Sequence, residues 1–168
     1  MRNRRNIFGL IGLILLAMVC AIIPATTSEA KKENNKSQVP DTVLDYAEEY
    51  DDIMIVDLDD QHVYCVVGGE VIADSDCVSG DFETSPTPTG LYDVWYKNSD
   101  FYMKDQYYTA YATFFNDGIA IHDADAWRDE YGGDIYQWDG SHGCINTPRW
   151  FAKIVYNNTQ IGTPVYVY

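Results

Sequence analysis

Short β-type segments separated by turn residues are the feature that most limits how this chain can fold. A Gly68-Gly69 pair separates HVYCVV from VIADSDCV, and Asn116-Asp117-Gly118 separates YATFF from GIAIH. Such turns are typical of β-hairpins. Further segments of this kind are IMIVDL, LYDVWY and the closing PVYVY. Because no helical pattern alternates with these segments, they predict a mainly β sandwich or barrel rather than a parallel sheet.

Few helices are expected in this fold, one or two short ones within the domain. Residues 41–50 are compatible with a short helix capped by Asp41. A clearer helix is predicted from Thr147, as the N-cap, and Pro148, as the first helical residue, to Asn157. Its apolar residues follow helical spacing: Trp150, Phe151, Ile154 and Val155. The C-terminal strand after Gly162 is expected to pair within the sheet.

The N-terminal thirty residues differ from the rest of the chain. Arginines precede an apolar run, residues 7–23, and a small polar stretch that includes Ser28 and Ala30 follows it. This layout predicts a signal peptide over residues 1–30, with an uncleaved anchor helix over 7–23 as the alternative. Residues 31–40 are a polar linker, and the domain is expected over 41–168. The predicted location is exported, at the cell wall or outside the cell, with any membrane contact made only by the N-terminal segment.

Net charge and cysteine content exclude some classes of partner and leave one question open. The formal charge of −15 makes a nucleic acid partner unfavourable. After Cys20 three cysteines remain, an odd number that leaves at least one thiol unpaired. If Gly68 and Gly69 form the turn, Cys65 lies opposite Ile72 and Cys77 lies on the other face. A disulfide between Cys65 and Cys77 would then need a bulge.

One window concentrates the residue types needed for nucleophilic catalysis. His122 is followed by a spacer, residues 123–140, which begins with Asp123, and then by SHGCIN, which contains Cys144. A cysteine nucleophile needs a nearby base and donors for an oxyanion. His142 or His122 could be the base: an extended segment 142–144 would place His142 on the same side as the sulfur. Gly143 would let a substrate carbonyl approach, and a following helix would favour the thiolate.

Structural, metal-binding and redox roles are alternatives to a catalytic site in this window. Cys144 could be a buried apolar residue, with the histidines only satisfying hydrogen bonds. Zinc binding by two histidines and Cys144 lacks the usual ligand spacing, and a thiol redox protein would lack its CxxC motif. The sequence therefore implies no metal and no cofactor.

With these residues in view, the chain resembles the L,D-transpeptidase catalytic domain, also called the YkuD domain. The motif is IHDA followed, after the spacer, by SHGCIN. Further similarity lies in IMIVDLDDQHVYCVVGGEVI, in TSPTPTGLYDV and in GTPVYVY, so it covers roughly residues 53–168. The resemblance implies a YkuD-like β fold and a cysteine acyltransferase that acts on peptidoglycan stem peptides.

The resemblance also implies roles for individual residues. Cys144 would attack the carbonyl of the third residue of a tetrapeptide stem, release D-alanine and pass the acyl group to an amine of a neighbouring stem. His122 would move the proton, held by the backbone carbonyl of Asp123, while His142 and Gly143 would shape the oxyanion pocket. Asp123 departs from the Gly or Ser common in the family, and its carboxylate would adjoin the base if it turned inward. Candidate substrate-binding residues are Ser141, Asn146, Trp127, Tyr136 and Trp138, the last three in a spacer that resembles a mobile loop.

Two alternatives to transpeptidation remain at this stage. An L,D-carboxypeptidase would use water in place of the amine. A wall-binding module without turnover would keep the cleft only, although the intact His122 and Cys144 argue against it.

Overall fold

The structure is a computed structural model that describes residues 39–103 and 107–168. The predicted signal or anchor segment and nearly all of the predicted linker lie outside these residues. Within them, no helix combines the length and the apolar character needed to cross a membrane.

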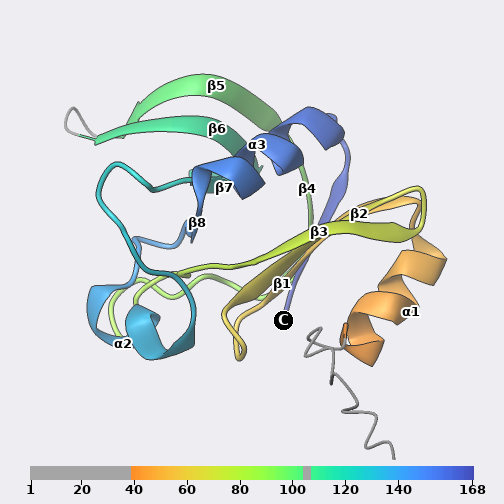
Figure 1. The fold of residues 1–168 in the computed structure, drawn as a ribbon, viewed down its shortest axis with the longest axis horizontal. Coiled ribbons are helices and arrows are strands. Elements are labelled where there is room, and N and C mark those ends of the chain that lie inside the picture. The colour runs from red at the N-terminus through yellow and green to blue at the C-terminus, as the bar shows by residue number, and fades with distance from the viewer. Residues whose placement is uncertain (1–38, 104–106) are drawn as a thin grey trace, which may run out of the picture. The chain divides into compact units, whose positions relative to one another are not determined.

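The described part of the chain is mainly β, with a few short helices, which confirms the predicted class. The elements are α1 Asp41–Glu49, β1 Asp52–Asp57, β2 His62–Val67, β3 Glu70–Asp76, β4 Gly90–Asp93, β5 Tyr96–Met103, β6 Tyr107–Asn116, β7 Ile119–Asp123, η1 Gly133–Ile135, α2 Tyr136–Asp139, β8 Ile145–Thr147, α3 Arg149–Asn158 and β9 Pro164–Val167. They form a five-stranded sheet in the order β3-β2-β1-β9-β4 and a four-stranded sheet in the order β5-β6-β7-β8. Figure 1 shows α3 beside β7 of the smaller sheet and α1 against the larger sheet, on the side away from β5, β6 and β7.

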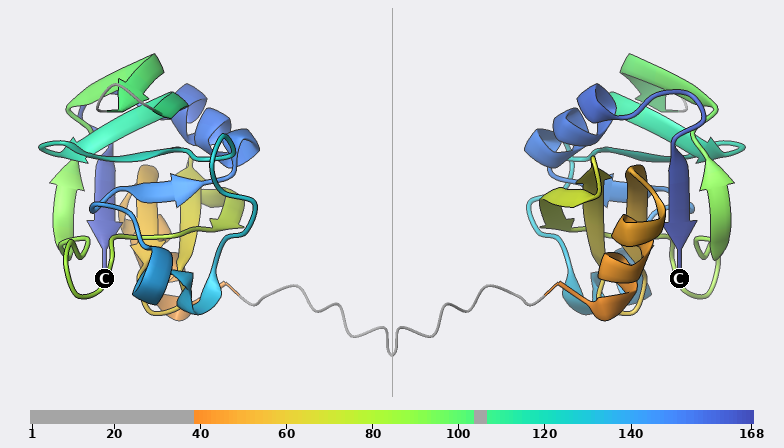
Figure 2. Two further views of the ribbon diagram at one scale, coloured as in Figure 1. Left: turned by 90° about the vertical axis from the view of Figure 1, so that its left-hand side faces the viewer. Right: turned by 90° about the vertical axis from the view of Figure 1, so that its right-hand side faces the viewer.

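The two sheets enclose the main core, and one helix covers the outside of the larger sheet. Apolar residues of β1, such as Met54 and Val56, pack in one cluster with Ile121 and Ile145 of the smaller sheet and with Phe151 of α3. On the other face of β1, Ile53 and Ile55 pack against α1. Because side chains alternate along a strand, β1 can bury both of its faces in this way. Two further views show α1 against the larger sheet and α3 along the smaller one (Figure 2).

The β2–β3 hairpin turns at Gly68 and Gly69, as predicted, but its register differs from the prediction. A bulge places Cys65 opposite Ala73, so the expected pairing of Cys65 with Ile72 is wrong. The extra residue shifts the alternation of side chains by one position. Cys65 and Cys77 therefore face the same buried cluster, not opposite faces. Both are free thiols, and burial raises the pKa of Cys65 to about 12.

The C-terminal strand β9 is an inner strand of the larger sheet, as expected. It runs parallel to β1, with Met54 opposite Val165, and antiparallel to β4, with Tyr92 opposite the same valine. Its side chains Val165 and Val167 are buried.

Both predicted helices form, but neither begins with the predicted cap. Asp41 is the first residue of α1 and follows Pro40, and no side chain caps that helix. Thr147 is the last residue of β8, so its assignment as the N-cap of α3 is wrong; Pro148 occupies that position instead. Thr147 lies in the sheet because β8 pairs with β7, and its hydroxyl donates to the carbonyl oxygen of His122 over 3.2 Å.

Candidate active site

Two neighbouring parallel strands carry the residues of the predicted site. In the pairing of β7 with β8, Ile121 lies opposite Ile145 and His122 lies opposite Asn146. The two isoleucines belong to the core between the sheets, so the side chains of His122 and Asn146 point to the other face. Cys144 comes directly before β8, two residues ahead of Asn146, and the alternation places it on the same side. The topology thus brings His122 and Cys144 to one face of the smaller sheet.

The ring of His122 is fixed by hydrogen bonds at one nitrogen only. Its Nδ1 lies 2.9 Å from the carbonyl oxygen of Asp123. The hydroxyl of Thr109, on β6, donates to the same carbonyl oxygen over 2.5 Å and lies 3.2 Å from Nδ1. A carbonyl oxygen can only accept, so Nδ1 carries the proton of the neutral ring. Nε2 is buried and has no hydrogen-bond partner among the described residues.

The surroundings of His122 favour its neutral form. The side chain is 1% exposed, and the ring of Trp127 lies against it with 6.0 Å between ring centroids. Burial lowers the pKa of His122, and the backbone hydrogen bond and the charge of Asp123 oppose this shift. The imidazole is therefore available as a proton acceptor at neutral pH.

Cys144 lies at the edge of this site. Its residue is half-buried, and Sγ is 3.7 Å from the carbonyl oxygen of Gly118 in the β6–β7 turn. Burial raises the pKa of the Cys144 thiol, and a backbone hydrogen bond with Ala120 opposes the shift. Both shifts favour the uncharged side chains, a thiol at Cys144 and an imidazole at His122, and a thiol needs a base before it can act as a nucleophile.

The SHGC segment is a tight loop closed by Ser141. The Ser141 hydroxyl donates to the carbonyl oxygen of Cys144 over 2.5 Å and accepts the N–H of Gly143 over 3.0 Å. Gly143 has φ +112°, a conformation that glycine adopts without strain. The expectation of an extended segment 142–144, with His142 beside the sulfur, is therefore wrong: the chain bends there and His142 is exposed.

A second segment, residues 78–89, holds this loop from outside the motif. Val78 exchanges both backbone hydrogen bonds with Asn146, and Ser141 N–H donates to the carbonyl oxygen of Ser79. Thr87 donates its hydroxyl to the carbonyl oxygen of Gly143 over 2.8 Å and accepts the N–H of Gly80 over 2.9 Å. A Cβ at Gly80 would lie 2.9 Å from the Cα of Gly143, so the two segments of backbone are in contact at these glycines. This close contact fixes the position of the loop that carries Cys144.

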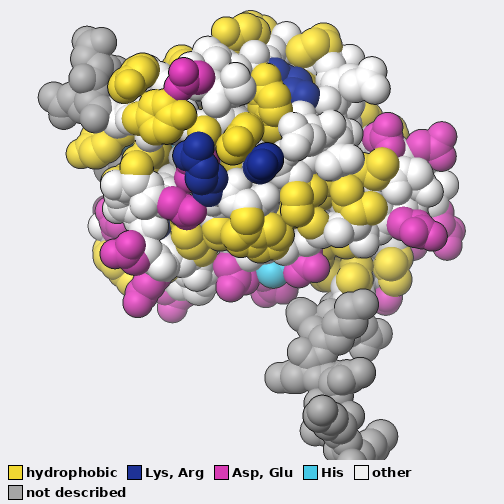
Figure 3. Space-filling model, turned by 45° about the horizontal axis from the view of Figure 1, so that its top comes forward, with side chains coloured by type: hydrophobic (Ala, Val, Ile, Leu, Met, Phe, Trp, Pro, Cys, Tyr) yellow, Lys and Arg dark blue, Asp and Glu magenta, His cyan; other side chains and the backbone are white. Residues whose placement is uncertain are grey.

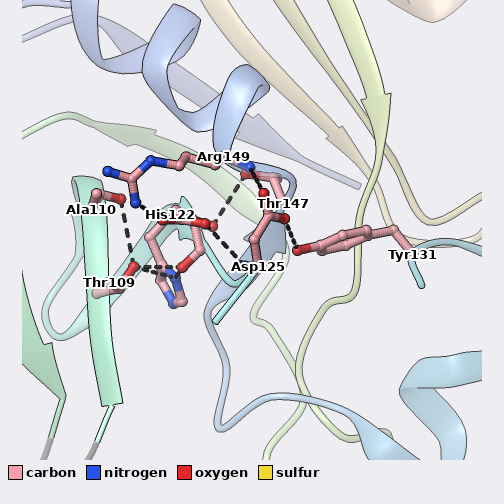
Figure 4. Close-up of polar contacts among 8 residues, drawn as sticks. Thr109, Ala110, His122, Asp125, Tyr131, Thr147 and Arg149 are labelled. Carbon is pink, nitrogen blue, oxygen red and sulfur yellow. Dashed lines mark hydrogen bonds and ion pairs between the residues drawn. The ribbon is translucent and has the colours of Figure 1, made fainter. Parts of the chain in front are cut away.

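The carboxylate of Asp123 turns away from His122. It is 2.8 Å from Nη1 of Arg149, the first residue of α3, and also accepts the N–H of Asp125 over 3.0 Å. Asp125 in turn accepts the backbone N–H of Arg149 and the hydroxyl of Tyr131. Figure 4 shows this chain of contacts beside the His122 ring. The possibility that the Asp123 side chain lies next to the base is not realised.

The candidate substrate-binding residues are divided among three places. Trp127 covers His122 and lines, with Trp138, a shallow pocket of about 240 Å³. Tyr136 lines a separate pocket of about 250 Å³ and packs edge-on against Phe82. The Ser141 hydroxyl is occupied within its own loop, and Asn146 is buried with Oδ1 lacking a partner among the described residues. Only the three aromatic side chains therefore line open space.

Comparison with known families gives one match that covers most of the chain. Residues 51–167 match the family model described as the L,D-transpeptidase catalytic domain. The chain belongs to this family.

Several solved structures of L,D-transpeptidases resemble this member of the family. A crystal structure of a mutant Enterococcus faecium L,D-transpeptidase is 38% identical, with a TM-score of 0.63, over 71% of this chain and 50% of that one. The NMR structure of the E. faecium catalytic domain is 39% identical, with a TM-score of 0.63, over 70% of this chain and 97% of that one. An L,D-transpeptidase from Mycobacterium smegmatis, at 22% identity and a TM-score of 0.60, shares the fold over 70% of this chain and 58% of that one. The chain thus spans about half the length of the crystallised Enterococcus protein. The search of curated proteins found no match.

Sequence reasoning missed three residues that support this L,D-transpeptidase-type site: Thr109, Thr87 and Arg149. Thr109 and Thr87 reach it from β6 and from the segment after β3, and Arg149 reaches it from α3. The two threonines could have been found only from the burial of their hydroxyl groups, since a buried hydroxyl needs a hydrogen-bond partner. The sequence around a single threonine does not show whether it is buried.

Proposed function

We propose that the protein is a peptidoglycan L,D-transpeptidase with Cys144 as nucleophile and His122 as the proton acceptor and donor. The observation that carries this proposal is the state of His122. Its ring is buried, with Nδ1 bonded to Asp123 and Nε2 left unpaired, on the sheet face that also carries Cys144. A buried nitrogen without a partner costs free energy, and a catalytic role is one reason for a folded protein to keep one; accepting the thiol proton would be that role.

In the first half of the reaction, the Cys144 sulfur attacks the carbonyl carbon of the third residue of a tetrapeptide stem. The thiol proton passes to Nε2 of His122 as the carbon–sulfur bond forms. The tetrahedral intermediate then breaks its bond to the terminal D-alanine nitrogen, which takes the proton from the imidazolium. This step leaves a thioester and free D-alanine.

In the second half, an amine of a neighbouring stem attacks the thioester carbonyl. His122 Nε2 accepts a proton from the amine, and the sulfur leaves and recovers a proton from the ring. The product is a link between the third residues of two stems. Water in place of the amine would give the shortened stem alone, so the carboxypeptidase differs only in the acceptor.

Backbone N–H groups of the SHGC loop would stabilise the oxyanion of both intermediates. Gly143 N–H is already donated to the Ser141 hydroxyl, so it is not free to bind the oxyanion in this structure. Cys144 N–H has no acceptor among the hydrogen bonds of the described residues. We therefore assign Cys144 N–H as an oxyanion donor, with Gly143 shaping the loop. Exposed His142 would contribute through its backbone at most.

Reactive β-lactams are expected to acylate the same sulfur. The E. faecium catalytic domain, 38% identical to this chain, has been solved acylated by ertapenem. A carbapenem carbonyl would meet the same nucleophile and base as a stem peptide. The ring-opened drug would then remain on Cys144 as a thioester.

Product analysis tests this function and separates its alternatives. The purified protein is incubated with a disaccharide tetrapeptide and, separately, with added tripeptide acceptor, and the muropeptides are separated by mass. Cross-linked dimer with released D-alanine supports the transpeptidase. Tripeptide without dimer identifies the carboxypeptidase, and neither product from folded protein identifies a binding module. His122→Asn is expected to abolish turnover, whereas the matched control His142→Asn, a change at an exposed ring, is expected to retain most of it.

A further inference from the structure

The carboxylate of Asp123 makes one of the few ion pairs among the described residues, and it lies behind the proposed base. The Asp123 side chain is 3% exposed, and its Oδ2 is 2.8 Å from Nη1 of Arg149, whose side chain is 46% exposed. The Arg149 guanidinium also lies 5.4 Å from the ring centroid of Tyr111. On this face of the molecule, which carries α3 and the β5–β6 hairpin, hydrophobic side chains surround the few Lys and Arg residues (Figure 3). Arg149 is thus held from outside while it holds Asp123.

The backbone of the same aspartate holds His122. Its carbonyl oxygen accepts Nδ1–H of His122 over 2.9 Å and the hydroxyl of Thr109 over 2.5 Å. The carbonyl of a single residue can rotate about its backbone dihedrals, so its direction depends on what fixes the residue. Besides the Thr109 hydroxyl, which binds the carbonyl itself, the contacts that fix Asp123 are made by its carboxylate: the ion pair with Arg149 and the bond from Asp125 N–H to the other carboxylate oxygen.

We infer that the Asp123–Arg149 ion pair positions His122, by fixing the carbonyl that selects the tautomer with a proton on Nδ1 and a free Nε2. The catalytic consequence of this inference rests on the proposed function. Asp123 and Arg149 are positioning residues, because they act on the reaction only through His122. Figure 4 shows the Arg149 side chain and the His122 ring in the same network of polar contacts. Asp123 links them, because its carboxylate contacts Arg149 and its carbonyl oxygen accepts Nδ1–H of His122.

The pair also controls charge near the base. The charged groups in the contacts that lead to His122 are Asp123 on β7, Asp125 after it and Arg149 on α3. The elements around the ring also carry other titratable side chains: Tyr107, Tyr108 and Tyr111 on β6, Lys153 and Tyr156 on α3, and Cys144 ahead of β8. Thr109 and Trp127, which contact the ring from β6 and the spacer, carry no charge. The charge of Asp123 raises the pKa of His122, against the larger effect of burial. Removing Arg149 would leave the Asp123 carboxylate buried without its counter-ion, and its charge would then raise the pKa of His122 further.

The tautomer can be measured directly, without any substrate. In ¹⁵N-labelled full-length protein, long-range ¹H–¹⁵N correlation spectra distinguish a protonated Nδ1 from a protonated Nε2. The chain has three histidines, so His62→Asn and His142→Asn variants assign the signals. We expect a single Nδ1–H tautomer for His122 in the wild type. Arg149→Gln should give a mixture of tautomers and a higher pKa, and Arg149→Lys, which keeps the charge, should recover much of the wild-type signal.

Two further variants complete the design. Lys153→Gln removes an exposed cation from the same helix and should leave the His122 signals unchanged. If Arg149→Gln does not fold, the double variant Asp123→Asn with Arg149→Gln removes both charges, leaves no buried unpaired carboxylate, and should show the tautomer mixture. The inference would be overturned if His122 in folded Arg149→Gln kept the tautomer and the titration of the wild type. If Arg149→Gln does not fold, the same result in the double variant would overturn it.

Acylation kinetics connect the tautomer to the reaction. We expect the rate constant for thioester formation in Arg149→Gln to fall about tenfold, since small displacements of a catalytic group have large effects. Its pH profile should shift to higher pH along with the pKa of His122, and substrate affinity should change little. An unshifted profile at an undiminished rate contradicts the catalytic part. Absence of any thioester in the wild type would refute the proposed function and not the tautomer result.

Discussion

Thr87 donates its hydroxyl to the carbonyl oxygen of Gly143 over 2.8 Å, across 56 residues of sequence. The same hydroxyl accepts the N–H of Gly80, and all of these atoms are buried. Thr87→Val keeps the shape but leaves a buried donor and a buried acceptor unpaired. We expect the free energy of unfolding to fall by about 1–3 kcal/mol, measured by urea denaturation. Thr89→Val, at an exposed position of the same segment, is the control and should change it little.

A side chain at Gly143 would strain the loop that carries Cys144, the proposed nucleophile. Its φ is +112°, and a Cβ would lie 3.3 Å from Cδ1 of Ile119. Gly143→Ala is expected to cost about 1–3 kcal/mol of stability and to slow acylation of Cys144. Gly118→Ala makes the same change where no atom lies within 4 Å and φ is not positive. If the two variants lost stability and rate equally, the positive φ of Gly143 would not matter.

Burial of neutral His122 predicts a specific dependence of stability on pH. Its pKa is lowered from 6.5 in the folded state, chiefly by burial, so the unfolded chain binds the proton more readily. The contribution of His122 is therefore fully present above about pH 6.5 and is lost as the pH falls from there toward the lower folded pKa. Chemical denaturation between pH 8 and pH 5 should show a smaller loss of stability on acidification for His122→Asn than for the wild type. His142→Asn should follow the wild type, since its ring is exposed.

Trp127 contributes to the burial that lowers the pKa of His122. Its ring packs against His122 at 6.0 Å and against Tyr107 at 5.4 Å between centroids. Trp127→Ala admits water to the imidazole, so the pKa of His122 should rise toward its ordinary value. NMR titration of the His122 ring measures this shift directly. Trp138→Ala, which removes a more exposed ring of the same spacer, should leave the titration unchanged.

Local sequence signals were enough for the hairpins of this fold and not for their register. Gly68-Gly69 and Asn116-Asp117-Gly118 predict turns because few other residues adopt the backbone conformations needed there. The bulge in the β2–β3 pairing, next to Cys65, has no such sequence signal. It places Cys77 on the same face as Cys65, whereas a regular hairpin would place the two on opposite faces. The three-residue strand β8 was not predicted because it exists only through pairing with β7 and with Val78.

The candidate site could be predicted as far as its motif extends. Residue types alone drew attention to the window with His122, His142 and Cys144, and the resemblance to the L,D-transpeptidase domain chose His122 as the base. The pairing of β7 with β8 brings His122 and Cys144, the residue before β8, to one face. The supporting residues Thr109, Thr87 and Arg149 lie in segments with no chemical pattern of their own. They reach the site through strand register and through the start of α3, which only the folded chain defines.

The central claim is that Cys144 forms a thioester with a peptidoglycan stem, and intact-protein mass spectrometry tests it most directly. The purified protein is mixed with a disaccharide tetrapeptide, beside Cys144→Ala and, as a control for a free buried thiol, Cys65→Ala. We predict an adduct on the wild type and on Cys65→Ala whose added mass equals the substrate less one alanine, with no adduct on Cys144→Ala. An adduct of that mass on Cys144→Ala, or neither adduct nor released D-alanine from folded wild type, would contradict the account.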